Sequence, residues 1–363
     1  MIELRNTSKL VAVALTVLIL FSSLHGTARA QDNLDQVVVM FDASHGEQFD
    51  MDDAQNGLKL VCDMVNASTR FVVRINYDAP LDESTLNGVD VLVIADPDVS
   101  NPFGESEFSG IAEMLANGSS LFLLGDPAIS QESEYWDEAL MQDMGDNLAM
   151  NRLMDGINMT GVRFSVNETN TDVWSDTMFD YTRALNDTYP WMMRFDAEAW
   201  DSTHPIFRNI NELFIMTATL KPVDLPSGIA SGYDTTFAQY RDGPLSWANY
   251  SFPNMTLDAF EEAPLSYSAI NGTFPSWLSA FTFGESRVVV AGSTIMFTGR
   301  TIDMPEADLT WFSAGDNARL FFNIIDWLSY GFVQAPGAIE PILIISTVIL
   351  AVGAAYYLLK KIR

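Results

Sequence analysis

Four short apolar segments, each followed by a polar turn, constrain the fold of this chain more than any other feature. They are Val37–Phe41, Phe71–Ile75, Asp90–Ala95 and Ser120–Leu124. The unbroken apolar run Val37–Phe41 is typical of a strand buried on both faces of a parallel sheet, and the other three segments also read as strands. The pattern therefore predicts four parallel strands in the first half of the chain.

Helical segments are expected between these strands. A helix is predicted from near Asp53 to Val65, and another from Glu105 to Asn117, where Gly118 provides a stop signal. The second half adds a strand at Arg287–Ala291 and a helix at Asn317–Leu328. Strands that alternate with helices form parallel sheets through right-handed crossovers. We therefore expect an α/β fold, Rossmann- or flavodoxin-like, with a mostly parallel sheet and helices on both faces.

The charge of the chain narrows the possible partners. Asp and Glu number 48 against 19 Lys and Arg, which gives a formal net charge of -29. A surface of this sign repels nucleic acid, so a nucleic-acid partner is not expected. The same surface suits cationic partners, divalent ions or a salty medium.

The N-terminal residues read as a secretory signal. Arg5 and Lys9 form a basic region, Leu10–Phe21 is a short apolar core, and Ala28–Ala30 matches the small-residue cleavage pattern. We expect residues 1–30 to be a signal peptide that is removed from the mature protein.

The C-terminal residues read as a membrane anchor. The uncharged stretch Ile342–Leu359 is about long enough for one bilayer crossing, and basic residues follow it in 360–363. Basic residues favour the cytoplasmic side, so residues 360–363 are predicted to be a cytoplasmic tail. Residues 36–330 then form an extracytoplasmic domain, joined to the anchor by the linker 331–341. The expected location is the cell membrane, or the endoplasmic reticulum membrane in a eukaryote, as a single-pass type I protein.

Eight Asn-x-Ser/Thr sequons support a glycosylated exterior. They are Asn66, Asn117, Asn158, Asn167, Asn186, Asn249, Asn254 and Asn271.

The order of several short motifs resembles a known family. Asp42-x-x-His45-Gly-Glu-Gln follows the first strand, Pro97 follows the third, and Gly118-x-x-Leu-x-Leu-Leu-Gly-Asp126 spans the fourth. Later segments, including His204-Pro-Ile-Phe and Arg287-Val-Val-Val-Ala-Gly-Ser, continue the pattern. This succession resembles the GIFT-type ectodomains, which are similar to class I glutamine amidotransferases without the enzyme.

The resemblance implies a non-enzymatic binding or scaffold subunit of a membrane complex. Members of the group include the non-catalytic DDOST-type subunit of oligosaccharyltransferase and the gliding-motility auxiliary proteins of ABC transporters. Both remain alternatives for this chain. The DDOST-type subunit has a further β-domain before its anchor, whereas only 331–341 intervenes here.

Two kinds of nucleophilic catalysis lack their motifs. A glutamine amidotransferase needs a Cys where a strand turns into a helix, but the fourth strand leads into Gly125-Asp126-Pro127. Cys62, the single cysteine, lies in a predicted helix and reads as a buried structural thiol. No Gly-x-Ser-x-Gly elbow is present either. The chain is therefore not expected to be an enzyme, and no cofactor is expected apart from a divalent ion.

The strongest chemical hypothesis is a divalent-cation site. Asp42, Asp96 and Asp126 each follow a predicted parallel strand, and His45 lies in the loop after the first. Carboxylates that converge at the ends of neighbouring strands suit Mg²⁺ or Ca²⁺. Alternatively, each Asp caps a turn and His45 is structural. A metal-dependent hydrolase that uses these four residues is the competing functional class.

Aromatic residues suggest one further partner. Five of them lie among sequons and carboxylates, where they could contact a glycan or a protein, although burial in the core is the alternative. They are Trp174, Tyr181, Tyr189, Trp191 and Trp200.

Overall fold

The computed structural model describes seven stretches of the chain. They are residues 36–166, 174–186, 188–223, 227–242, 246–247, 276–305 and 307–330.

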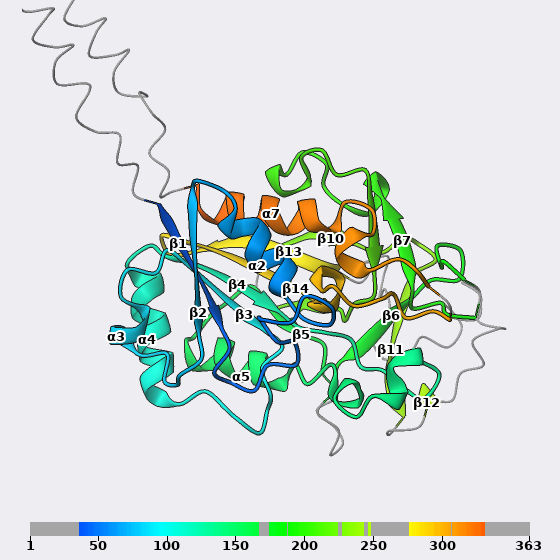
Figure 1. Cartoon of the computed structure of the whole chain (residues 1–363), viewed down its shortest axis with the longest axis horizontal. Helices are drawn as coiled ribbons and strands as arrows, with labels where there is room; N and C mark the ends of the chain where they lie inside the picture. The colour runs from blue at the N-terminus through cyan, green and yellow to red at the C-terminus, as the bar shows by residue number, and fades with distance from the viewer. Residues whose placement is uncertain are drawn as a thin grey trace, which may run out of the picture. The chain divides into compact units, whose positions relative to one another are not determined.

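A nine-stranded sheet forms the centre of the described part, and five of its strands are parallel (Figure 1). Their order in the sheet is β2-β1-β3-β4-β14, which is the doubly wound order 2-1-3-4-5. These strands are β1 (Val37–Asp42), β2 (Phe71–Asn76), β3 (Val91–Ala95), β4 (Ser120–Leu124) and β14 (Ser286–Ala291). The α/β class and the largely parallel sheet expected from the sequence are confirmed.

The rest of the sheet is antiparallel. Strand β13 (Ser276–Phe283) forms a hairpin with β14, and β9 (Leu220–Pro222) and β5 (Val162–Phe164) extend the sheet beyond it. Strand β10 (Gly228–Ser231) also pairs with β13. These strands make the sheet mixed, because each of them runs against its neighbour.

Helices cover both faces of the sheet (Figure 1). Helices α2 (Lys59–Asn66) and α7 (Asn317–Leu328) lie on one face, and α3 (Glu83–Leu86), α4 (Glu105–Ala116) and α5 (Leu148–Gly156) lie on the other.

Side-chain contacts follow the two faces. Because side chains alternate along a strand, each strand serves both helical layers. The ring of Phe321 in α7 lies 6.1 Å from that of Phe41 and 5.5 Å from that of Phe122. Leu92 and Leu123 point to the opposite layer, in the apolar core that also contains residues of α4 and α5.

Helix α2 is shorter than predicted. It begins at Lys59, because Asp53 Oδ1 accepts hydrogen bonds from the backbone N–H groups of Gln55 and Asn56 and holds a turn there. At Gly57 the backbone passes so close to the carbonyl of Asp50 that a Cβ would lie 1.9 Å from its oxygen. The prediction of a helix from Asp53 is therefore wrong by about two turns.

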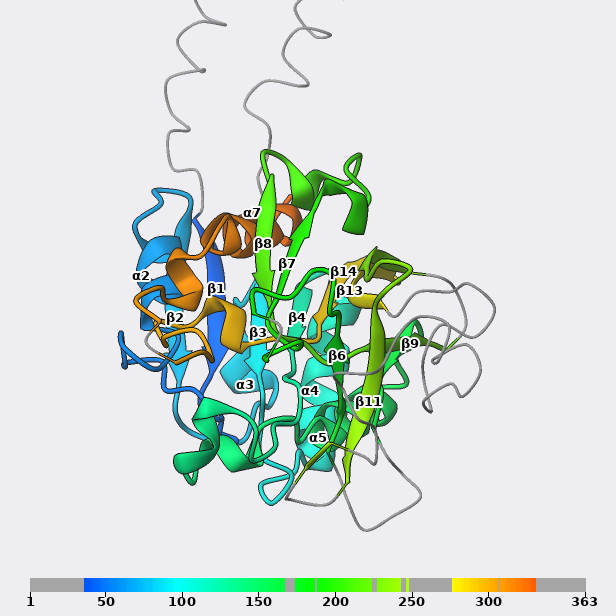
Figure 2. The same cartoon turned by 90° about the vertical axis from the view of Figure 1, so that its right-hand side faces the viewer.

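Two small sheets complete the described part (Figure 2). One contains β6 (Asp176–Phe179), β11 (Phe237–Asp242) and β12 (Ser246–Trp247), and the other contains β7 (Met193–Asp196) and β8 (Glu212–Ile215).

Three of the five aromatic residues considered for glycan contact are buried. Tyr189, Trp191 and Trp200 belong to the core, whereas Trp174 and Tyr181 are partly exposed. The indole of Trp191 donates to Asp303 Oδ2 over 2.7 Å, so its polar atom is also used internally. Core packing, the alternative for these residues, applies to these three.

Several sequence predictions fall on residues that the structure does not describe. These are the signal peptide 1–30, the linker 331–341, the span 342–359, the tail 360–363, and the sequons at Asn167, Asn249, Asn254 and Asn271. Within the described ranges, no helix has the length and apolar character needed to cross a membrane. The other four sequons, at Asn66, Asn117, Asn158 and Asn186, have exposed asparagines.

Candidate functional site

The candidate site lies where the parallel strands end and the connections diverge. The chain leaving β1 leads to α2 on one face, and the chain leaving β3 leads to α4 on the other. Ligands of doubly wound proteins bind in the crevice at such a switch point. Asp42, Asp96 and Asp126 occupy the ends of β1, β3 and β4, as the sequence predicts.

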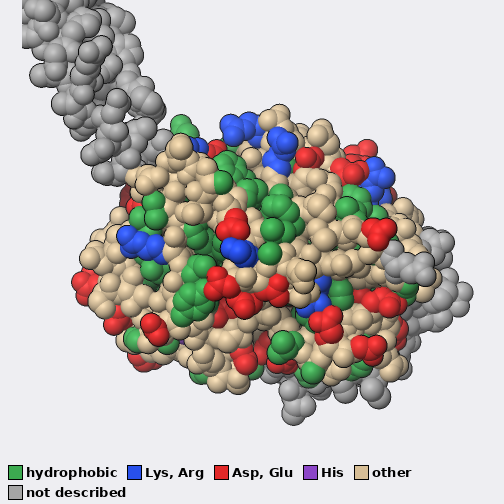
Figure 3. All heavy atoms as spheres, viewed as in Figure 1, with side chains coloured by type: hydrophobic (Ala, Val, Ile, Leu, Met, Phe, Trp, Pro, Cys, Tyr) green, Lys and Arg blue, Asp and Glu red, His purple; other side chains and the backbone are tan. Residues whose placement is uncertain are grey.

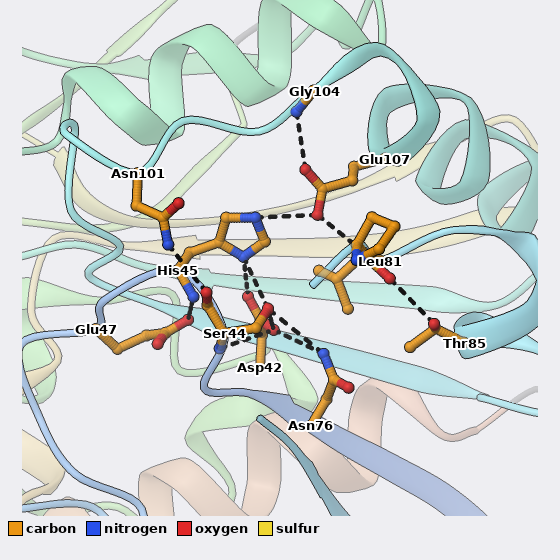
Figure 4. Close-up of polar contacts among 11 residues, drawn as sticks. Asp42, Ser44, His45, Glu47, Asn76, Leu81, Thr85, Asn101, Gly104 and Glu107 are labelled. Atoms are coloured by element: carbon orange, nitrogen blue, oxygen red, sulfur yellow. Dashed lines mark hydrogen bonds and ion pairs between the residues drawn. The ribbon is translucent and has the colours of Figure 1, made fainter. Parts of the chain in front are cut away.

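His45 is held between two carboxylates (Figure 4). Its Nδ1 lies 2.7 Å from Asp42 Oδ2, and its Nε2 lies 3.0 Å from Glu107 Oε1. The imidazole also stacks on Phe103, with 4.0 Å between ring centroids. All four residues are buried, so both ring nitrogens are occupied away from solvent.

The two carboxylates are also bound to other groups (Figure 4). Asp42 Oδ1 accepts hydrogen bonds from the Ser44 hydroxyl and from Asn76 Nδ2. Glu107 accepts the backbone N–H of Leu81 at Oε1 and that of Gly104 at Oε2. Glu107 thus ties the beginning of α4 to the loop after β2. We name Asp42, His45 and Glu107 the paired cluster.

The pKa shifts agree that this cluster is an ion pair. Burial alone would lower the pKa of His45, but the hydrogen bond and charge of Asp42, aided by Glu107, raise it above the ordinary value. Burial would raise the pKa of Asp42, but its bond to His45 and the charge of that ring lower it. The direction of both shifts favours the charged form of His45, which has a carboxylate at each nitrogen.

Glu47 borders the paired cluster from the same loop. Burial and the negative charge of Asp42 raise its pKa to about 7. One ligand atom from each of Asp42, His45 and Glu47 lies within 4.8 Å of the others, so this group meets the distances for a metal site. However, a metal on His45 would have to replace a proton that bonds to Asp42 or Glu107. The donor set therefore fits an ion pair better than a metal.

A second group of buried acids lies beside the first. Asp96, Asp126 and Asp146 are all at least nine-tenths buried, and each has one carboxylate oxygen without a hydrogen-bond partner. Asp126 Oδ1 accepts the backbone N–H groups of Thr294 and Ile295 over 3.1 and 3.0 Å, but its Oδ2 has no partner. We name these three aspartates the unpaired cluster.

The pKa values of all three carboxyl groups in the unpaired cluster are raised. Burial raises the pKa of Asp96 well above its ordinary value, and the negative charges of Asp126 and Asp146 raise it further. Burial likewise raises the pKa of Asp126, and it raises that of Asp146 to about 7. The direction is the opposite of that in Asp42, because no cation bonds to these groups.

The structure divides the four predicted site residues between the two clusters. Asp42 and His45 belong to the paired cluster, and Asp96 and Asp126 to the unpaired one. The sequence reasoning missed Glu107 and Asp146. Glu107 lies in the first turn of α4, where an acidic residue is expected for capping and for the helix dipole, and Asp146 lies two residues before α5, so neither position gave a separate signal.

The other reactive side chains have structural roles. Cys62 is buried in α2, and burial raises the pKa of its thiol to about 12. His204 begins a short helical turn, where its Nδ1 accepts the backbone N–H of Ile206. The buried position of Cys62 agrees with the interpretation of the sequence.

Comparisons with known proteins return distant structural matches. No family model and no curated protein matches the chain. The N-terminal domain of mmIFT52 superposes with a TM-score of 0.48 at 15% identity, covering 80% of this chain and 100% of that domain. A ThuA-like protein from Bacteroides uniformis superposes with a TM-score of 0.41 at 11% identity, covering 81% of this chain and 91% of that protein. Cytoplasmic protein STM3548 from Salmonella typhimurium superposes with a TM-score of 0.42 at 10% identity, covering 80% of this chain and 98% of that protein.

Proposed function

We propose that this chain is a non-enzymatic, membrane-anchored binding subunit with a flavodoxin-like ectodomain of the GIFT type. The signal-like residues 1–30 and the apolar stretch 342–359 support the membrane location. The motif order of the sequence supports the family. The acidic surface, seen on the face in Figure 3, supports a partner other than nucleic acid.

The bonding of both His45 nitrogens to carboxylates is the main support for proposing that the protein is not an enzyme. A hydrolase at these strand ends needs a general base or a metal ligand, and His45 is the histidine that the sequence offers there. Both of its nitrogens bond to buried carboxylates, and its raised pKa favours the charged form. An imidazolium can neither accept a proton nor bind a metal. Cys62 is buried with a raised pKa, so it is also a poor nucleophile.

A pull-down of the full-length protein in mild detergent tests this function. Mass spectrometry of the bound material should identify a membrane partner in stoichiometric amount, and a tagged, unrelated type I membrane protein is the control. Recovery of an oligosaccharyltransferase catalytic subunit selects the DDOST-like alternative. Recovery of an ABC transporter selects the auxiliary-protein alternative.

Two results would contradict the proposal. One is recovery of the protein alone under conditions that preserve other membrane complexes. The other is divalent-ion-dependent hydrolysis of model esters, amides or phosphoesters that disappears in the Asp96→Asn variant.

A further inference from the structure

The last turn of α7 lies at the edge of the sheet where the parallel strands begin. Ser120, the first residue of β4, donates its hydroxyl to Leu328 O over 2.9 Å. Arg287, near the start of β14, donates to another carbonyl of this turn over 2.6 Å, and Arg70, which directly precedes β2, pairs with its carboxylate. This edge is opposite to the one that carries the paired and unpaired clusters, which lie where the same strands end.

Two arginines share one carboxylate in this turn. Arg70 Nη1 pairs with Asp326 Oδ1, and Arg208 Nη2 lies 3.5 Å from Asp326 Oδ2. The side chain of Arg208 is 67% exposed and that of Asp326 is 25% exposed, so more of the arginine than of the carboxylate meets solvent. The charge of this group is positive, in a chain whose formal net charge is -29.

Aromatic rings accompany a third arginine. The guanidinium carbon of Arg287 lies 5.0 Å from the ring centroid of Trp327 and 4.9 Å from that of Tyr330. Trp327 is partly exposed, and Tyr330 is 71% exposed. We name Arg70, Arg208, Arg287, Trp327 and Tyr330 the basic aromatic face.

We propose that the basic aromatic face binds the phosphate headgroups of a phospholipid membrane. Guanidinium groups bind phosphate through charge-assisted hydrogen bonds. Trp and Tyr side chains favour the headgroup level, because they combine an apolar ring with a polar atom. Basic residues beside an anionic membrane add to the attraction, and salt weakens their contribution.

The position of the face along the chain favours a membrane over other partners. Tyr330 is the last described residue, and the linker 331–341 separates it from the predicted span 342–359. A linker of this length reaches at most about 40 Å, which keeps the face near the bilayer surface. This step rests on the membrane anchor of the proposed function. In this orientation the candidate site, at the other ends of the strands, faces the extracytoplasmic solution.

Two exposed acids limit the strength of the contact. Glu285 lies two residues before Arg287, and Asp201 lies near His204, whose ring is 5.3 Å from that of Trp327. Replacement of one of these acids should therefore strengthen lipid contact, and Glu285→Lys is the variant that tests this direction.

The test measures lipid contact in full-length protein held in nanodiscs of phosphatidylcholine and phosphatidylglycerol. Cys62 is buried, so a fluorescent label reacts selectively with the thiol introduced by Thr69→Cys, beside Arg70, or by Leu140→Cys, at the opposite edge. A nitroxide on the lipid headgroups should quench the first label more strongly than the second. Arg208→Glu should lower the quenching of the first label at least about twofold. Circular dichroism confirms that each variant is folded.

Arg194→Glu is the matched control. Arg194 is 62% exposed and pairs with Glu212, whose backbone oxygen accepts the N–H of Asp316 at the beginning of α7. It is thus a surface arginine near the other end of that helix, and its reversal should leave the quenching unchanged.

Three results would overturn the proposal for protein that is inserted in the nanodisc. The first is equal quenching of the two labels, and the second is an equal fall in Arg208→Glu and Arg194→Glu. The third is contact that appears only after N-glycans are removed, since Asn66 ends α2 and Asn117 follows α4 at this edge. Failure of the protein to insert would contradict the membrane anchor and this proposal together.

Discussion

The paired and unpaired clusters both contain buried acids near the ends of neighbouring strands, but they differ in whether a cation faces the carboxylates. Around His45, each carboxylate faces a cation, and the free oxygens accept backbone or side-chain donors. In the other cluster, none of the three carboxylates is in an ion pair within the described residues, and each has a buried oxygen without a hydrogen-bond partner. Burial of an acidic residue therefore does not fix the direction of its pKa shift; the group bonded to the carboxylate does.

Replacement of His45 should cause the largest loss of unfolding free energy among the variants considered. His45→Gln leaves two buried carboxylates without their cation, which should cost about 3–5 kcal/mol of unfolding free energy. Urea unfolding followed by circular dichroism measures this loss. His204→Gln is the control, because that ring caps a short turn and contacts the ring of Trp327 but bonds to no buried carboxylate, and it should cost about 1 kcal/mol. Equal losses in the two variants would show that the paired cluster contributes no special stability.

The same substitution should have opposite effects in the two clusters. Asp42→Asn breaks a buried ion pair and should destabilise the fold by about 3 kcal/mol. Asp126→Asn removes a buried carboxyl group whose pKa is raised by burial, and its amide oxygen can still accept from Thr294 and Ile295. In EDTA this variant should therefore be more stable than the parent by about 1 kcal/mol. Thermal unfolding of both variants in EDTA checks the sign, and destabilisation by Asp126→Asn would break the distinction.

The paired cluster should make stability depend on pH. The pKa of His45 is raised in the folded protein, so its contribution is complete below the unfolded value near 6.5 and is lost as pH rises through the folded value. The unfolding free energy should fall by at most about 1.4 kcal/mol per pH unit for this one proton.

Comparison with Glu107→Gln isolates this contribution. That variant lacks one of the two carboxylates that raise the pKa of His45. Its loss of stability with rising pH should therefore begin at a lower pH than in the parent. Glu47, with a pKa of about 7, loses its proton in the same range and in the same direction, so both curves should be recorded in a Glu47→Gln background. Identical curves for parent and Glu107→Gln would contradict a buried imidazolium.

The smallest expected effect concerns the ring beneath His45. Phe103 stacks on the imidazole, and Phe103→Leu keeps an apolar side chain but removes the π face. The loss should be about 1 kcal/mol, and it should shrink in a His45→Gln background because the stacked partner is then absent. A double-mutant cycle measures the coupling, and additive losses would mean that the stacking is incidental.

The parallel half of the fold could be predicted because β1, β3, β4 and β14 each contain a continuous apolar run, while the edge strand β2 is interrupted by Arg74. Val37–Phe41 and Ser120–Leu124 need no partner to be recognised, since burial on both faces gives them a uniform composition. The antiparallel strands β9 and β5 have three residues each, too few to show a period of two. Their pairing depends on tertiary contacts that a local pattern does not contain.

The candidate site was predictable in position but not in pairing. Asp42, Asp96 and Asp126 follow strands, so their place at one edge of the sheet follows from the order of elements. Which of them bonds to His45 depends on loop geometry, and the second carboxylate on that ring comes from α4, 62 positions later. Glu107 reads as a capping residue in the sequence, and it does cap α4 while also binding His45.

Strand β2 is an edge strand of the central sheet and pairs on one side with β1. An edge of this kind invites pairing with a strand of another molecule. Its Val73 N–H is already bonded to Asn66 Oδ1 over 3.3 Å, and the charged Arg74 is exposed beside it. Asn66 is also one of the predicted glycosylation sites. If Asn66 carries a sugar on its amide nitrogen, the sugar stands beside this edge and hinders its pairing with a strand of another molecule.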